Sequence, residues 1–141
     1  MQFDGRSSKI MVVDNDRTTL EMVQIRLDVA GFHAITARSG PAALEILAVS
    51  RPDVLILERN LPGMDGIDVL EALAALYPSR PIPVLLVGRD LAAEDVRLGM
   101  RMGVRDCLTK PFSGAAVLER VGRMLKKSGA PGAPARPYVL V

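Results

Sequence analysis

The chain has 141 residues, the size of one ordinary domain, and 49% of them are hydrophobic, so it can build a core and is not a disordered chain. No apolar run approaches the roughly 20 residues that a membrane-spanning helix needs, and residues 1–8 contain no apolar signal region. The single cysteine, Cys107, excludes an internal disulfide, and together these features predict a cytoplasmic protein that does not contact a membrane.

The formal net charge of +2 is unevenly distributed along the chain. Residues 1–88 contain 8 Lys and Arg against 11 Asp and Glu, whereas residues 89–127 contain 9 against 5. An acidic first part and a basic last part indicate two surfaces of different character.

Short apolar runs alternate with stretches that repeat apolar residues at helical spacing. Strands are predicted over 9–13, 33–36, 54–57, 83–87 and 106–109. The first helix, which Asp16 or Thr18 can cap and Gly31 ends, follows the first strand. The next three helices are predicted over 41–49, 67–76 and 92–102, and Val117, Leu118, Val121 and Leu125 mark a last helix. Five alternations with short connections predict an α/β fold with a doubly wound parallel sheet.

The runs at 54–57 and 83–87 are apolar on both faces, which is typical of central parallel strands covered by helices. We expect residues 1–127 to form this domain. Residues 128–141 are rich in Gly, Ala and Pro and are predicted to be a tail or linker.

Polar side chains follow several of the predicted strands. Asp14, Asn15 and Asp16 follow the first strand, Glu58 the third and Lys110 the fifth. Because the central strands lie side by side, we expect Asp14, Glu58 and Lys110 to converge at their carboxyl ends. Ligands of such sheets bind in the crevice beyond those ends. A neighbouring ammonium would relieve the repulsion between two carboxylates, so the group is either a functional site or a structural charge cluster.

Four stretches of the chain resemble the receiver domain of bacterial two-component response regulators. They are Lys-Ile-Met-Val-Val-Asp-Asn-Asp at 9–16, the segment at 51–66 that ends in Leu-Pro-Gly-Met-Asp-Gly, Pro-Val-Leu-Leu-Val-Gly at 83–88, and Thr-Lys-Pro-Phe at 109–112. The resemblance covers about residues 9–127. It implies a flavodoxin-like five-stranded sheet in the order 2-1-3-4-5 and a cis bond before Pro111.

In that family, an aspartate after the third strand accepts a phosphoryl group from a histidine kinase, and two acidic residues after the first strand help to hold Mg²⁺. A Thr or Ser and a lysine contact the phosphoryl group, and an aromatic residue on the fifth strand changes rotamer with the Thr. By this resemblance, Asp14 and Lys110 match the family pattern. Four positions depart from the pattern. Asn15 occupies the second acidic position, Glu58 the phosphoacceptor position, Gly88 the Thr or Ser position and Cys107 the aromatic position.

Each departure weakens phosphoryl transfer for a physical reason. Glu58 places its carboxylate one methylene further from the backbone, and in-line transfer depends on near-attack geometry. Asn15 removes a charge from the divalent site, so binding of Mg²⁺ through Asp14 and Glu58 should be weak or absent, and no other cofactor is implied. Gly88 has no hydroxyl for a phosphoryl oxygen, and Cys107 is too small to act as the aromatic lever.

The sequence therefore favours an atypical receiver that acts by protein–protein interaction and is not phosphorylated in the usual way. Glu58 either stands in for the charge of an acyl phosphate or is simply a carboxylate satisfied by Lys110. No Ser/His/Asp or Cys/His set is evident, so an enzyme is not expected. DNA binding by this domain is not expected either, because a helix-turn-helix unit and an aromatic platform are lacking.

Two alternatives remain open. Basic residues of the predicted fourth helix and its surroundings could bind an anionic ligand such as a cyclic dinucleotide, or could form an ordinary solvated face. These residues are Arg89, Arg97, Arg101 and Arg105. Alternatively, the domain is the N-terminal regulatory part of a larger effector. In either case the resemblance implies that partners, including a second copy in a homodimer, dock on the surface of the helix at 92–102, the strand at 106–109 and the last helix.

Overall fold

The computed structural model describes residues 7–128. Strands and helices alternate five times along this part of the chain, as the sequence predicts. The elements are β1 (Lys9–Val13), α1 (Arg17–Val29), β2 (His33–Ala37), α2 (Gly40–Leu47), β3 (Val54–Glu58), α3 (Gly66–Leu76), β4 (Val84–Gly88), α4 (Ala93–Arg101), β5 (Val104–Thr109) and α5 (Gly114–Ser128).

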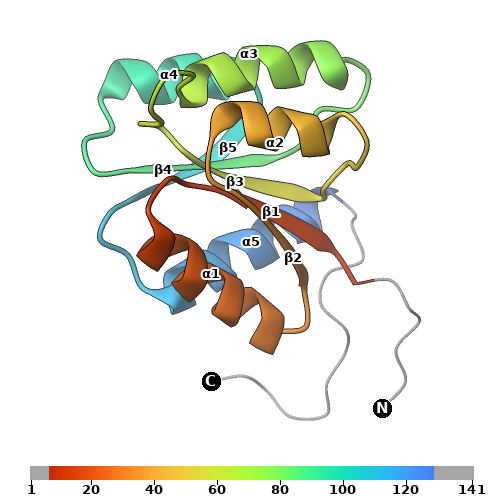
Figure 1. Ribbon diagram of the computed structural model, residues 1–141, viewed down its shortest axis with the longest axis vertical. Coiled ribbons are helices and arrows are strands. Elements are labelled where there is room, and N and C mark those ends of the chain that lie inside the picture. The colour runs from red at the N-terminus through yellow and green to blue at the C-terminus, as the bar shows by residue number, and fades with distance from the viewer. Residues whose placement is uncertain (1–6, 129–141) are drawn as a thin grey trace.

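All five strands are parallel and form one sheet in the order β2-β1-β3-β4-β5, which confirms the predicted flavodoxin-like fold. The helices cover both faces of the sheet: α1 and α5 lie on one side, and α2, α3 and α4 on the other (Figure 1). Strand order reverses between β1 and β3, so the carboxyl ends of these two strands flank the crevice expected in such sheets.

The core has two layers, one on each face of the sheet. Alternate residues of the inner strands point to opposite faces, so Met11, Leu55 and Leu57 pack toward α2 and α3, whereas Val12 and Ile56 pack toward α1 and α5. Every residue of β3 and β4 is buried, which explains why their sequences are apolar on both faces.

Strands β3 and β4 extend one residue beyond their predicted carboxyl ends. Glu58 and Gly88 belong to the ladder, where Glu58 lies opposite Val87 and Gly88 lies opposite Thr109. The predictions stopped where the apolar run stops, but ladder pairing depends on the backbone and continues through a polar residue or a glycine. Both residues are therefore held by the rigid sheet rather than by a loop.

Loop side chains cap the N-termini of four helices: Asp16 caps α1, Ser39 caps α2, Asp65 caps α3 and Ser113 caps α5. Two of these caps lie at the carboxyl ends of β1 and β3. Asp16 is the N-cap of α1, where its carboxylate accepts a hydrogen bond from the backbone N–H of Thr18 at 3.1 Å. Asp65 caps α3 and forms a reciprocal capping box with Asp68. These caps fix the directions of the helices that leave the β1 and β3 ends of the sheet.

At its carboxyl end, α5 includes Ser128, one residue past the predicted domain boundary. The remaining residues of the predicted tail, 129–141, lie outside the described part of the chain. Within residues 7–128, no helix has both the length and the apolar character that crossing a bilayer requires.

Candidate functional site

The carboxyl ends of β1, β3 and β5 bring Asp14, Glu58 and Lys110 together, as predicted. The Lys110 ammonium lies 2.7 Å from Oδ2 of Asp14 and 2.5 Å from Oε1 of Glu58. Asp14 is 1% exposed and Glu58 is 4% exposed, so both carboxylates are almost entirely removed from water. Burial of two carboxylates is tolerated here because a single ammonium contacts both.

Backbone amides satisfy the other oxygen of each carboxylate. The N–H of Asp16 donates to Oδ1 of Asp14 at 2.9 Å, and the N–H of Asn60 donates to Oε2 of Glu58 at 2.8 Å. Each oxygen of the pair therefore contacts a nitrogen donor. The result is a closed polar cluster at the centre of the strand ends.

Two opposing effects act on the pKa of Lys110. Burial lowers it, but hydrogen bonds and charge interactions with Asp14 and Glu58 raise it more, and the net result is a pKa above the ordinary 10.5. Lys110 thus keeps its positive charge throughout the physiological range. The peptide bond between Lys110 and Pro111 is cis, as the resemblance implies.

Gly88 lies directly against Glu58. A Cβ at position 88 would lie 3.3 Å from Oε2 of Glu58 and 3.0 Å from Cδ2 of Leu91, so a larger side chain would need both neighbours to move. The longer glutamate side chain occupies space beside the β4 backbone that a residue with a Cβ would share. The sequence alone shows two separate departures at these positions, whereas the structure shows that they are neighbours.

A shallow cavity of about 260 Å³ opens outside the cluster. Its lining residues are Asn15, Asp16, Glu58, Asn60, Arg89, Asp90 and Lys110. Asp16 is exposed, and the hydroxyl of Thr19 is the main cause that lowers its pKa. Arg89 also lines this cavity, whereas Arg97, Arg101 and Arg105 do not.

The donor set, as it is arranged, fits a Mg²⁺ ion poorly. Mg²⁺ requires near-octahedral oxygen ligands. Here the carboxylate oxygens of Asp14 and Glu58 face the Lys110 ammonium and backbone amides, and the neighbouring Asn15 contributes no charge. Within the described residues, no group of three or more His, Cys, Asp and Glu is arranged to hold a metal ion. Weak Mg²⁺ binding nevertheless stays a prediction.

Cys107 lies on β5 opposite Leu86, three residues before Lys110, and is partly buried. Burial is the main cause that raises the pKa of its thiol, so the thiolate is disfavoured. This environment suits a packed strand residue better than a nucleophile.

The arginines of α4 and β5 are separate from the Lys110 cluster. Arg97, Arg101 and Arg105 are all exposed. Arg101 and Arg105 line a second cavity of about 280 Å³, which also includes Ile82 and Gly103 from the segments that enter β4 and β5. This cavity lies at the amino ends of the strands, opposite the carboxylates, and Arg97 does not line it.

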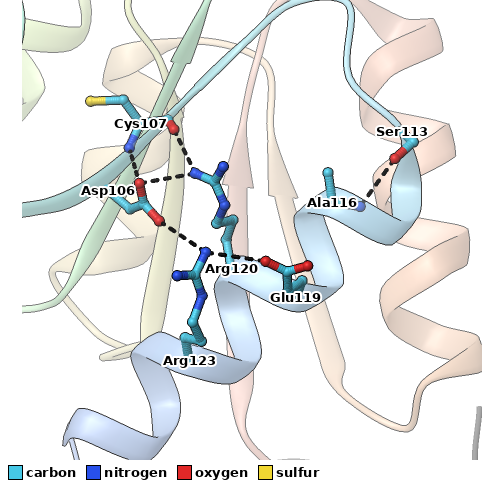
Figure 2. A network of polar contacts seen from close by, with 7 residues as sticks. All are labelled: Asp106, Cys107, Ser113, Ala116, Glu119, Arg120 and Arg123. Carbon is cyan, nitrogen blue, oxygen red and sulfur yellow. Dashed lines mark hydrogen bonds and ion pairs between the residues drawn. The ribbon is translucent and has the colours of Figure 1, made fainter.

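An ion-pair network that the sequence analysis missed joins β5 to α5. Asp106 accepts a hydrogen bond from Arg120 at 2.9 Å, and Arg120 also donates to the carbonyl oxygen of Cys107 at 2.9 Å (Figure 2). Arg123 lies between Asp106, at 3.9 Å, and Glu119, at 3.2 Å. The helical spacing of Arg123 and Glu119 was the only local signal, because the contacts with Asp106 depend on how α5 packs.

Curated relatives match most of this chain. It is 37% identical over 126 residues to the probable transcriptional regulatory protein TcrX of Mycobacterium tuberculosis, a match that covers 89% of this chain and 53% of the relative. It is 35% identical over 122 residues to the alkaline phosphatase synthesis transcriptional regulatory protein PhoP of Bacillus subtilis, covering 86% and 50%. The chain thus spans about half the length of these relatives.

Solved structures agree on the fold. The chemotaxis protein CheY4 of Vibrio cholerae superposes with a TM-score of 0.78 at 29% identity, covering 85% of this chain and all of that one. The signal receiver domain of a signal transduction histidine kinase from Syntrophus aciditrophicus gives 0.75 at 27% identity, covering 96% and 99%. The family model of the response regulator receiver domain matches residues 10–122. The chain therefore belongs to the response regulator receiver domain family of two-component signalling.

Proposed function

We propose that this chain is an atypical receiver that signals through protein contacts and is not switched by phosphorylation in the usual way. The observation that carries the proposal is the contact between the Lys110 ammonium and Glu58 at 2.5 Å. The lysine that contacts a phosphoryl group in the family is engaged here by a side-chain carboxylate. The site therefore has its charge partner without any phosphoryl group.

The surroundings of Glu58 support the same conclusion. Each oxygen of its buried carboxylate already has a nitrogen partner, so an attack on phosphorus through either oxygen would have to displace that partner. Gly88 provides no hydroxyl, and a Cβ at this position would lie only 3.3 Å from Oε2 of Glu58. A nucleophile that is paired and displaced by one methylene is poorly placed for in-line transfer.

Phosphodonor labelling tests this proposal. Incubation of the unmodified protein with acetyl phosphate and Mg²⁺ should produce no stoichiometric aspartyl or glutamyl phosphate by intact-protein mass spectrometry, and beryllofluoride should give no bound fluorine signal by NMR. The matched variant is Glu58→Asp with Gly88→Thr, which restores both residue types of the family. Efficient labelling of the unmodified protein would refute the proposal.

The fixed contact leaves two interpretations of Glu58, a stand-in for an acyl phosphate or a merely satisfied carboxylate. The carboxylate of Glu58 reaches Lys110, as a phosphoryl oxygen would, which favours the stand-in. Replacing Glu58 by Gln, which keeps the shape but loses the charge, separates the two. A stand-in predicts altered partner binding by Glu58→Gln, whereas a satisfied carboxylate predicts only lower stability.

We further propose that the chain is the regulatory part of a cytoplasmic regulator. Its relatives TcrX and PhoP are named as transcriptional regulators and are about twice as long as the matched region. A receiver in such a protein would control an effector through its surface and would not contact DNA itself. The proposed surface is formed by α4, β5 and α5, where the basic part of the sequence lies.

The cavity beside Arg101 and Arg105 favours a second candidate function, binding of an anionic ligand such as a cyclic dinucleotide. Arg101 and Arg105 could contact phosphates while the apolar walls from α3 pack against a base. Isothermal titration calorimetry with cyclic dinucleotides tests this candidate. An absence of heat at millimolar ligand, with Arg101→Gln as the matched variant, would eliminate it.

A further inference from the structure

Helix α4 is held weakly by apolar packing. Gly99 is its only buried residue, and Leu98 and Met100 are 41% and 61% exposed. Its N-cap residue, Ala92, makes no side-chain capping hydrogen bond. Because neither apolar burial nor capping fixes this helix strongly, its polar contacts have a large share in deciding its position.

Arg59 supplies such a contact. Its Nη2 donates to Asp95 in the first turn of α4 at 3.2 Å, while its Nη1 donates to Asp65, the N-cap of α3, at 3.1 Å. The Arg59 side chain is 20% exposed and that of Asp95 is 24% exposed, so solvent screens this pair less than a fully exposed one. A guanidinium can hold two carboxylates at once because its donors point in different directions.

The contact between Arg59 and Asp95 forms a bridge from the end of β3 to α4, and its β3 end is rigid. Arg59 directly follows Glu58, and its backbone N–H donates to the carbonyl oxygen of Val87 at 2.8 Å. A Cβ at Gly66 would lie 2.6 Å from the carbonyl oxygen of Glu58 and 3.0 Å from Cα of Arg59, so the start of α3 is pressed against the same backbone. Of the three elements that Arg59 joins, α4 is therefore the one that has freedom to move.

We infer that Arg59 is a positioning residue that ties α4 to the backbone of the Glu58 site and so holds the partner-docking surface in one arrangement. This inference rests on the proposed function, in which partners dock on α4, β5 and α5. The Glu58–Lys110 contact sets the charge of the site. The adjacent Arg59 holds α4, the helix that partners would contact, at a fixed position relative to the backbone at the end of β3.

Hydrogen exchange of the full chain tests the inference without any partner. Arg59→Met and Asp95→Asn should each accelerate exchange of the α4 amides, roughly threefold to tenfold, because the helix loses its anchor. Exchange in α1, on the opposite face of the sheet, should not change. If Arg59→Met does not fold, Asp95→Asn alone still tests the bridge, because Asp95 is a partly exposed helix residue.

Glu94→Gln is the matched control for Asp95→Asn. Glu94 and Asp95 are both acidic residues of the first turn of α4, so either substitution removes one favourable charge from the helix N-terminus. Within residues 7–128, however, Arg59 forms its ion pairs with Asp65 and Asp95 and not with Glu94. The inference requires faster exchange for Asp95→Asn than for Glu94→Gln. Equal acceleration by the two would overturn it.

A double-mutant cycle closes the test. Arg59→Met in the Asp95→Asn background should accelerate α4 exchange little further, since the shared contact is already lost. Additive effects would show that the two residues act separately and would overturn the inference. Phosphodonor labelling addresses the proposed function independently: a labelled protein whose α4 still depends on Arg59 would refute that function and leave the bridge intact.

Discussion

Lys110 compensates the negative charge of the site, because its ammonium contacts the buried carboxylates of Asp14 and Glu58. Two carboxylates that share a low-dielectric site repel each other, and backbone amides alone compensate this only in part. The stability of the strand ends should therefore depend on this lysine more than on any exposed arginine of α4.

Replacement of Lys110 by Met, which keeps the aliphatic stem, should lower the free energy of unfolding by about 3 kcal/mol or more, because two buried carboxylates lose their partner. Urea denaturation at neutral pH measures the loss. Arg97→Met is the control, since Arg97 is exposed, and should change the free energy of unfolding by less than about 0.5 kcal/mol. Similar values for the two variants would contradict the assigned role of Lys110.

The same lysine predicts a pH dependence. Its pKa in the folded protein is raised above the unfolded value near 10.5, so its contribution to stability is fully present below that pH and is lost as the pH rises through the raised pKa. The difference in unfolding free energy between the unmodified protein and Lys110→Met should be constant from pH 7 to 9 and shrink above about pH 10.5. A difference that grows with alkaline pH would disprove this sign.

Gly88 and Glu58 should behave as a coupled pair. Gly88→Thr places a Cβ 3.3 Å from Oε2 of Glu58 and should cost about 1–3 kcal/mol by overpacking. In the shorter Glu58→Asp background the cost should be smaller by at least about 0.5 kcal/mol, although the contact with Leu91 remains. Thermal or urea unfolding of the four proteins gives the coupling. Strictly additive costs would mean that the two departures are independent.

At the scale of the elements, the approach of α4 to the sheet depends on Gly99. A Cβ there would lie 2.9 Å from Cγ2 of Val104, so Gly99→Ala should destabilise the domain by about 1–3 kcal/mol even though alanine favours helices. Gly122 in α5 is the matched position, with nothing within 4 Å of an added Cβ. Gly122→Ala should stabilise by about 0.5–1 kcal/mol. Unfolding curves compare the two, and stabilisation by both would refute the close contact.

The α5 helix illustrates another element-scale effect. Arg120 reaches back to Asp106 and to the carbonyl oxygen of Cys107, so α5 and β5 form one connected unit (Figure 2). By contrast, α4 is joined through Arg59 to the β3 end of the sheet. The proposed partner surface thus combines α5 and β5, which Arg120 joins directly, with α4, which packs on the sheet at Gly99 and is joined to the β3 end by Arg59.

At the scale of the whole molecule, the basic surface of the last part of the chain is expected to mediate association. Reversal of Arg97 and Arg101 to Glu should weaken a homodimer through α4, β5 and α5, because it replaces two exposed positive charges with negative ones. Sedimentation velocity over a range of concentrations measures this, with Arg38→Glu on the far β2 edge as control. Unchanged self-association of the double variant would contradict this surface.

Much of the architecture could be predicted from local patterns. Apolar runs such as 54–57, with turn residues at their ends, predict the buried parallel strands, and parallel strands must bring Asp14, Glu58 and Lys110 to one edge. The position of Arg89 could not be predicted so closely: it lies in the turn between β4 and α4 and lines the cavity beside Lys110, which residue spacing alone does not show.

The α/β alternation, the family resemblance and the residue types at the strand ends can all be read from the amino-acid sequence, because they depend on periodicity and on short motifs. The folded chain was needed to see that Glu58 pairs with Lys110 while its other oxygen lies close to Gly88, and that Arg59 reaches Asp95, 36 residues away. Such contacts depend on how far each helix lies from the sheet and where each side chain ends. The spacing of residues along the chain contains no measure of those distances.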